Sequence, residues 1–164
     1  MRELVIDASV AVKWLVQEEH SNEARLLLQH LSLAQGSANL ILIAPDVILA
    51  EIGHALRRLV NRGEIAPALS EILYDYFVTH VPLVLIGLHS DPRYDAENHL
   101  VQDAIRLGNQ NVYSFYDALY ICLALKRNAF LVTSDRKLYE KPLPLSQGQQ
   151  LIWVGDIPQW LSSL

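Results

Sequence analysis

Four acidic residues stand where carboxylates could meet and do chemistry. Two of them, Asp7 and Asp135, follow the short apolar runs 4–6 and 129–133. Runs of this kind predict strands that are buried on both faces of a sheet. In an open parallel sheet, ligands bind outside the carboxyl ends of the strands, near the point where the strand order reverses. We therefore expect Asp7 and Asp135 to face a ligand site at that edge.

The other two acids, Asp117 and Glu51, lie on or beside apolar faces of predicted helices. From Phe115 to Leu125, Asp117 is the only residue that is neither apolar nor aromatic, so the pattern predicts a helix buried all round. A carboxylate in such a place needs a proton, hydrogen-bond donors or a cation. Glu51 falls beside the apolar stripe of a helix that runs to about Asn61.

Four converging carboxylates would repel one another and raise each other's pKa values. A hard divalent cation removes that penalty, and carboxylates without His or Cys suit Mg²⁺ or Mn²⁺ better than Zn²⁺. Such a site can lower the pKa of a bound water and stabilise an in-line displacement at a phosphodiester. The acids together therefore indicate metal-dependent phosphodiester chemistry.

Three of the acids also have a purely structural alternative as helix caps. Asp7 and Asp135 could each cap the helix that follows. Ser114 and Asp117 have the spacing of a capping box, which would occupy Asp117 with a backbone N–H. Taken singly, none of these acids is a specific signal, and only their combination indicates a site.

Glu51 could instead face solvent or pair with an arginine later on its helix, Arg58 or Arg62. These two form a basic cluster with Arg57, and Lys126 and Arg127 form another. A solvated helix face or end is the favoured explanation of each cluster. Contacts to RNA remain an alternative for both, because phosphates are bound mainly by Arg and Lys.

Apolar strands alternate with helices along the chain, which indicates an α/β domain with a parallel sheet. We expect strands at 4–6, 40–43, 129–133 and 151–154, with 82–86 either a strand or a connector. We expect helices at 8–16, 21–33, 45–61, 67–80, 92–107 and 114–125. Gly63 and Gly108 should end two of them. Residues 142–148 read as a loop, so residues 1–164 should form a single domain.

The composition is that of an ordinary globular protein, with 51% hydrophobic and 19% charged residues. The net charge of −5 argues against a basic nucleic-acid footprint over the whole surface. The lone cysteine, Cys122, lies in the apolar helix and reads as a core residue. There is no signal-peptide pattern and no apolar run of about 20 residues, so we expect a cytoplasmic protein without membrane contact.

Several segments resemble, in order, the successive motifs of PIN-domain ribonucleases. The resemblance covers residues 4–135, and the segments are Val5-Ile6-Asp7-Ala8-Ser9, Val12-Lys13-Trp14-Leu15, Pro45 with Glu51, Tyr116-Asp117-Ala118-Leu119-Tyr120 with Leu123-Ala124, and Leu131-Val132-Thr133-Ser134-Asp135. It implies a three-layer α/β/α PIN-like fold, with a short central parallel sheet flanked by helices. The size resembles that of VapC-like toxins of toxin–antitoxin pairs. An aspartyl-phosphate phosphatase fits poorly, since its second acid would stand where Ser9 does.

The resemblance also implies roles for individual residues. The matches to the family's catalytic, metal-binding acids are Asp7, Glu51, Asp117 and Asp135. Ser9 would position the first acid or a water, and Thr133 and Ser134 would support the last acid. No motif histidine is present to act as a general base.

By this resemblance, the activity would be Mg²⁺- or Mn²⁺-dependent cleavage of RNA that leaves a 5′-phosphate and a 3′-hydroxyl. The implied partners are the RNA substrate, a small cognate antitoxin that blocks the acidic site, and a second copy in a homodimer. The alternative is a catalytically inactive PIN-like module that only binds RNA or a protein.

Overall fold

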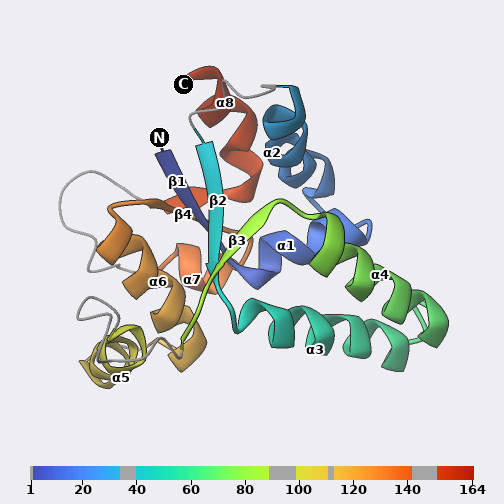
Figure 1. The fold of residues 1–164 in the computed structure, drawn as a ribbon, viewed down its shortest axis with the longest axis horizontal. Helices are drawn as coiled ribbons and strands as arrows, with labels where there is room; N and C mark the ends of the chain where they lie inside the picture. Colours follow the sequence, from blue (N-terminus) through green and yellow to red (C-terminus); the bar gives the residue numbers. More distant parts are fainter. Residues whose placement is uncertain (1, 34–39, 89–98, 111–112, 142–150) are drawn as a thin grey trace.

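The computed structural model describes residues 2–33, 40–88, 99–110, 113–141 and 151–164 (Figure 1). The expected loop at 142–148 and the first residues of the expected helix at 92–107 lie outside this described part. Within it, none of the helices is both long and apolar enough to cross a membrane.

Five parallel strands form one sheet in the order β3-β2-β1-β4-β5. The strands are β1 (Arg2–Ile6), β2 (Leu40–Pro45), β3 (Leu83–Ile86), β4 (Phe130–Thr133) and β5 (Leu151–Trp153). Every expected strand is present, and the segment 82–86 is a strand and not merely a connector. The chain builds outward from β1 to β3 and then returns to the other side of β1 for β4 and β5. The strand order therefore reverses between β1 and β4, whose carboxyl ends lie side by side.

Helices cover both faces of this sheet, as Figure 1 shows. One layer holds α1 (Ala8–Leu15), α2 (Ser21–Leu33), α3 (Ile48–Asn61), α4 (Pro67–His80) and α8 (Ile157–Ser162). The other layer holds α5 (Leu100–Gln110), α6 (Phe115–Arg127) and α7 (Arg136–Tyr139). The right-handed crossover rule accounts for this, because the chain crosses the sheet in opposite directions before and after β3. The expected three-layer α/β/α architecture is confirmed.

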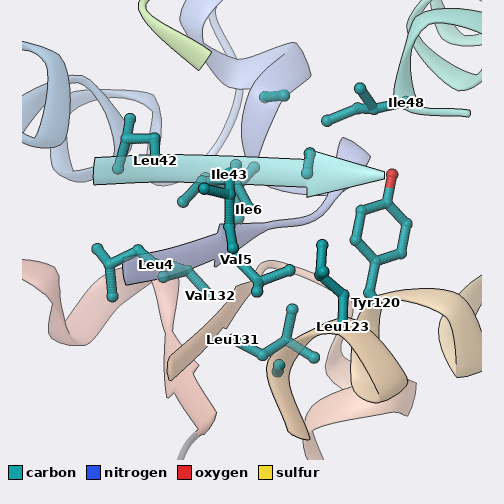
Figure 2. Close-up of a cluster of buried hydrophobic side chains, with 14 of the residues drawn as sticks. Leu4, Val5, Ile6, Leu42, Ile43, Ile48, Tyr120, Leu123, Leu131 and Val132 are labelled. Carbon is teal, nitrogen blue, oxygen red and sulfur yellow. The ribbon is translucent and has the colours of Figure 1, made fainter. Parts of the chain in front are cut away.

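The core lies on both sides of β1, whose last three residues, 4–6, are fully buried. Residues 118–124 of α6 are buried without interruption, which confirms the expectation of a helix apolar on all sides. Figure 2 shows Leu123 and Tyr120 of this helix beside the strand residues. Burial raises the pKa of the Cys122 thiol to about 11, which suits the expected role as a core residue.

The ends of α6 differ from the expectation, because Phe115, Tyr116 and Leu125 are 41%, 50% and 39% exposed. Helix α6 packs on α5, β1, β2 and β4, and its buried residues are those of its middle turns, 118–124. The first turn, which carries Asp117, is therefore at the surface and not in the core.

Some element boundaries also differ. Pro45 ends β2, and α3 begins only at Ile48. Helix α3 ends as expected before Gly63, which has a φ of +72°. Helix α5, in contrast, runs past Gly108 to Gln110, because Gly108 does not adopt the left-handed conformation of a helix C-terminus. The short helix α8 and the 3₁₀ turn η1 (Val154–Asp156) were not predicted, and α7 was expected only under the capping alternative for Asp135.

Candidate active site

Asp7 stands at the carboxyl end of the central strand β1 and is the N-cap of α1. One carboxylate oxygen, Oδ1, accepts hydrogen bonds from Ser9 Oγ at 2.5 Å and from the Val10 N–H at 3.0 Å. The other oxygen, Oδ2, accepts a hydrogen bond from Thr133 Oγ1 at the end of β4. The side chain is only 5% exposed, and burial raises the pKa of Asp7 to about 6 in spite of these three donors.

A small network of hydroxyl groups links the loops that follow β1 and β4. Ser9 Oγ accepts a hydrogen bond from the Ser134 N–H at 2.9 Å, and Thr133 Oγ1 accepts one from the Asp135 N–H at 3.0 Å. Both hydroxyls also donate to Asp7. The network therefore orients Asp7 and fixes the distance between the two loops. Ser134 contributes its backbone N–H to this network.

Asp135 caps α7, as the capping alternative proposed. Its Oδ1 accepts hydrogen bonds from the backbone N–H groups of Lys137 and Leu138 at 2.8 and 3.2 Å. The residue is exposed, and its negative charge contributes to the raised pKa of Asp7. Capping and membership of an acidic site are compatible, because Asp135 lines the same pocket as Ser9 and Glu51.

Glu51 is positioned by a residue that is 69 positions away in the sequence. Tyr120 Oη donates a hydrogen bond to Glu51 Oε2 at 2.6 Å, and this tyrosine is only 3% exposed. Burial raises the pKa of Glu51, and the negative charges of Asp7 and Asp117 raise it further. Pairing of Glu51 with Arg58 or Arg62 was a wrong alternative, because no such ion pair exists within the described residues.

Asp117 is a half-buried residue with its side chain 25% exposed. It completes the capping box: its N–H donates to Ser114 Oγ at 3.1 Å, and its Oδ2 accepts from the Ser114 N–H at 3.4 Å. Lys141 Nζ lies 3.8 Å from the same oxygen. The expectation of an isolated carboxylate inside the core was therefore wrong, and the buried acid is Asp7.

A pocket of about 690 Å³ is lined by two of the four acids, Glu51 and Asp135, whereas Asp7 and Asp117 do not line it. At one end it is lined by acidic and hydroxyl side chains, among them Ser9, Glu51 and Asp135. Towards its other end it follows one face of α3, which carries His54, Arg58 and Arg62. Tyr116, from the first turn of α6, also lines it. The pocket therefore combines an acidic end with a basic end.

The arginines and lysines of the two basic clusters do not all lie at the same place in the structure. Arg57 lines a second, smaller hollow between α3 and α4, away from Arg58 and Arg62. Lys126 Nζ pairs with Asp103 at 2.6 Å, and Arg127 pairs with Glu3 at 3.9 Å. Of the two clusters, therefore, only Arg58 and Arg62 border the acidic pocket.

Sequence reasoning missed Tyr120, Tyr116 and Lys141 and set His54 aside. Tyr120 had a detectable signal, since a tyrosine in an all-apolar helix needs a buried partner for its hydroxyl. Tyr116 had no such signal, because the apolar pattern assigned it to the core. Lys141 lies in no motif, and only the position of α7 brings it to Asp117.

The donor chemistry fits a hard divalent cation, because the groups are carboxylates and hydroxyls. Asp135 raises the pKa of Asp7, and Asp7 and Asp117 raise that of Glu51. This mutual repulsion is what a bound cation would relieve. Within the described residues, however, no three acids, histidines or cysteines are close enough to form a complete ligand group. The acids thus agree in type and location with a metal site, but their spacing is wider than that of a coordination shell.

Known proteins share this sequence pattern and this fold. A family model described as the PIN domain matches residues 4–143. The chain belongs to the PIN-domain family. Ribonuclease VapC1 of Mycobacterium tuberculosis is 33% identical over 142 residues, which cover 87% of this chain and 92% of that protein.

Solved structures show the same PIN fold. PAE2754 from Pyrobaculum aerophilum has a TM-score of 0.64 at 18% identity, and the match covers 99% of this chain and 91% of that chain. VapC20 of Mycobacterium tuberculosis, described as a toxin that cleaves the sarcin–ricin loop, has a TM-score of 0.52 at 13% identity and covers 85% and 96% of the two chains. At these identities the structures support the fold alone, whereas the family model and VapC1 establish the kinship.

Proposed function

We propose that this PIN-domain protein is a divalent-metal-dependent endoribonuclease and the toxin of a toxin–antitoxin pair. The observation that carries the proposal is the arrangement around Asp7. A buried carboxylate stands at the point where the strand order reverses, is held through both oxygens, and is electrostatically coupled to Asp135 and Glu51. Kinship with a ribonuclease at 33% identity supports the choice of RNA as substrate.

In this proposal the metal ligands are Asp7, Glu51, Asp117 and Asp135. A bound Mg²⁺ or Mn²⁺ would supply positive charge to the scissile phosphate and make a water nucleophilic at neutral pH. Ser9 and Thr133 hold Asp7 in one orientation, and Tyr120 does the same for Glu51. Arg58 and Arg62 lie along α3 on one side of the acidic end, where they are placed to bind phosphates of the substrate strand.

The toxin role rests on kinship with VapC ribonucleases and on the acidic site itself. A small antitoxin that inserts a basic side chain would neutralise this site. Lys141 already places its ammonium group 3.8 Å from Asp117 Oδ2, so the acids do accept a cationic side chain. Growth arrest on expression of the chain alone, relieved by co-expression of a short neighbouring gene, is the expected result. Harmless expression of a protein that cleaves RNA in vitro would refute the toxin role.

The proposal includes a homodimer. Large apolar side chains exposed on α4 support it, because monomers rarely leave extended apolar patches in water. These residues are Leu69, Ile72 and Tyr76, which fall on one face of the helix. Light scattering coupled to size exclusion should give twice the 18.5 kDa mass of the chain, and a monomer at micromolar concentration would refute this part.

The deciding experiment incubates the purified protein with total RNA in Mg²⁺, Mn²⁺ or EDTA. We expect cleavage in either metal, none in EDTA, and products that carry 5′-phosphates. Cleavage that persists in EDTA would refute the metal mechanism. RNA binding without cleavage in any metal would instead favour the alternative, a catalytically inactive PIN-like module.

A further inference from the structure

Tyr116 is an aromatic side chain that the fold leaves exposed inside the pocket. It stands in the first turn of α6, is 50% exposed, and lines the pocket together with Glu51 and Asp135. Phe115, itself 41% exposed, meets the Tyr116 ring edge to face with 5.8 Å between the ring centroids. The two rings are adjacent to the fully buried part of α6, so their exposure is a local feature and not a property of the whole helix.

The surroundings of Tyr116 define what could bind there. The face of α3 that lines the pocket carries Glu51, Arg58 and Arg62 in succession. At 1.5 Å per residue, Arg58 and Arg62 lie about 10 and 16 Å along the helix axis from Glu51. Arg58 has no ion pair within the described residues, and Arg62 pairs with Glu64 at 2.6 Å where both side chains are half exposed. The pocket thus offers a flat aromatic surface beside a row of cationic groups.

A ligand that matches both features carries repeated negative charges and flat rings. Single-stranded nucleic acid has this chemistry, because its phosphates pair with Arg and its unstacked bases expose their faces to aromatic side chains. A duplex does not match, since its base faces are covered by neighbouring bases. A protein segment with aromatic side chains is the other possible occupant, but it would lack the repeated anions that Arg58 and Arg62 require.

We propose that Tyr116 is a base-stacking residue, on which an unpaired nucleotide beside the scissile phosphate rests while Arg58 binds the backbone. This inference rests on the proposed function and assigns to Tyr116 the discrimination between unpaired and paired RNA at that site. Phe115 contacts the tyrosine ring edge to face. Tyr116 then selects a strand conformation and not a base sequence, because every base has a face that can stack.

The test measures binding separately from cleavage. A fluorescein-labelled short oligouridine and a fully paired RNA duplex of the same length are titrated by fluorescence anisotropy in Mg²⁺. The protein carries Asp7→Asn to prevent turnover. Tyr116→Ala should weaken binding of the single strand by about 5- to 100-fold, the usual loss for one stacked base. Binding of the duplex should change less than about twofold. Tyr116→Phe, which keeps the ring, should bind like the parent.

Tyr139→Ala is the matched control. Tyr139 is also an exposed tyrosine, 37% exposed on α7, but its ring packs against Trp153 and does not line the pocket. It should leave binding of both RNAs unchanged. Equal losses for single strand and duplex with Tyr116→Ala would overturn the stacking role. So would unchanged RNA binding with loss of the complex with a co-expressed antitoxin, since Tyr116 would then be a protein contact.

Failure of this inference can be told apart from failure of the proposed function. If the wild-type chain cleaves RNA in Mg²⁺ and Tyr116→Ala binds single strands equally well, only the stacking role is wrong. If the wild-type chain cleaves no RNA but binds single strands through Tyr116, the nuclease proposal fails and the stacking role stands. If the chain cleaves RNA but binds no single strand, only the stacking role is wrong, and if it does neither, both proposals are wrong.

Discussion

The two halves of the acidic site are held in different ways. At the strand ends, Asp7 is buried and takes hydrogen bonds from Ser9, Val10 and Thr133. On the helices, Glu51 is anchored by Tyr120 alone, and Asp117 is a quarter exposed within a helix cap. Asp7 is therefore fixed in orientation and costly to charge, whereas the carboxylates of the helix half have fewer hydrogen bonds. We infer that Asp7 defines the metal position.

The largest expected effect comes from removing a ligand from either half. Asp7→Asn or Asp117→Asn should reduce RNA cleavage by more than about 100-fold, beyond the 10- to 100-fold typical for loss of a residue that merely supports a ligand. Initial rates on a labelled RNA in saturating Mg²⁺ measure this, with circular dichroism to verify folding. If one of the two variants cleaves RNA at a near-normal rate, the acid that it replaces is not a required metal ligand.

Asp7 should also make the stability of the protein depend on pH. Its pKa is raised from 3.8 to about 6 in the folded state, mainly by burial. Folding therefore favours the protonated form: the contribution is fully present below about pH 4 and is lost as the pH rises through 6. A shift of about two units corresponds to about 3 kcal/mol.

Urea unfolding in EDTA between pH 4 and pH 7 tests this prediction. The wild-type stability should fall over this range relative to Asp7→Asn, which cannot ionise at this position. The comparison with Asp7→Asn cancels the titration of other acids. A stability difference between the two proteins that is constant with pH would show that Asp7 is not the buried titrating group.

Tyr120→Phe probes the weaker anchor of the helix half. It removes one hydrogen bond to a carboxylate without creating a large cavity, and loss of such a supporting partner usually costs 10- to 100-fold in metal affinity. We expect about a tenfold higher Mg²⁺ concentration for half-maximal thermal stabilisation. Tyr76→Phe, which removes an exposed hydroxyl on α4, is the control and should not change it. Equal Mg²⁺ dependence in all three proteins would mean that Glu51 does not need Tyr120.

The smallest expected effect is a difference in the free energy of unfolding between a variant of the strand half and a variant of the helix half. Asp7→Asn should leave the protein as stable or more stable at pH 7, because it removes a buried charge. Asp117→Asn should cost about 0.5 kcal/mol instead, since Asp117 caps α6 and its charge favours the helix N-terminus. Urea midpoints in EDTA compare them. Stabilisation by both variants would mean that like-charge repulsion outweighs capping at Asp117.

The sequence predicted the strands and the strand-end acids well because both depend on local patterns. The apolar runs before Asp7 and Asp135 are unambiguous, and the parallel topology follows from their alternation with helices. The exposure of Tyr116 and the bond between Tyr120 and Glu51 were not predictable in this way. They depend on which turns of α6 are buried and on two helices that meet across 69 residues of sequence.

The bounds of the short helix α7, expected only through the capping alternative for Asp135, and the existence of α8 were not predicted for a related reason. With 4 and 6 residues, these helices are too short to display a helical period, and they form because Asp135 caps one and the other packs on α2. At Gly108 the sequence predicted a helix end that does not exist. A glycine within a helix cannot be told from one at a helix end until its φ is known.

The contact between Asp7 and Thr133 joins residues 126 positions apart, and that between Ser9 and Ser134 joins residues 125 apart. Strand β1 is synthesised first, but it is the central strand of the sheet and its pairing with β4 requires a segment that is synthesised much later. During synthesis, a ribosome that has released only the first hundred or so residues presents no assembled acidic site, because β4 is still missing. A chain of this topology assembles its acidic site only after β4 has been synthesised and has paired with β1.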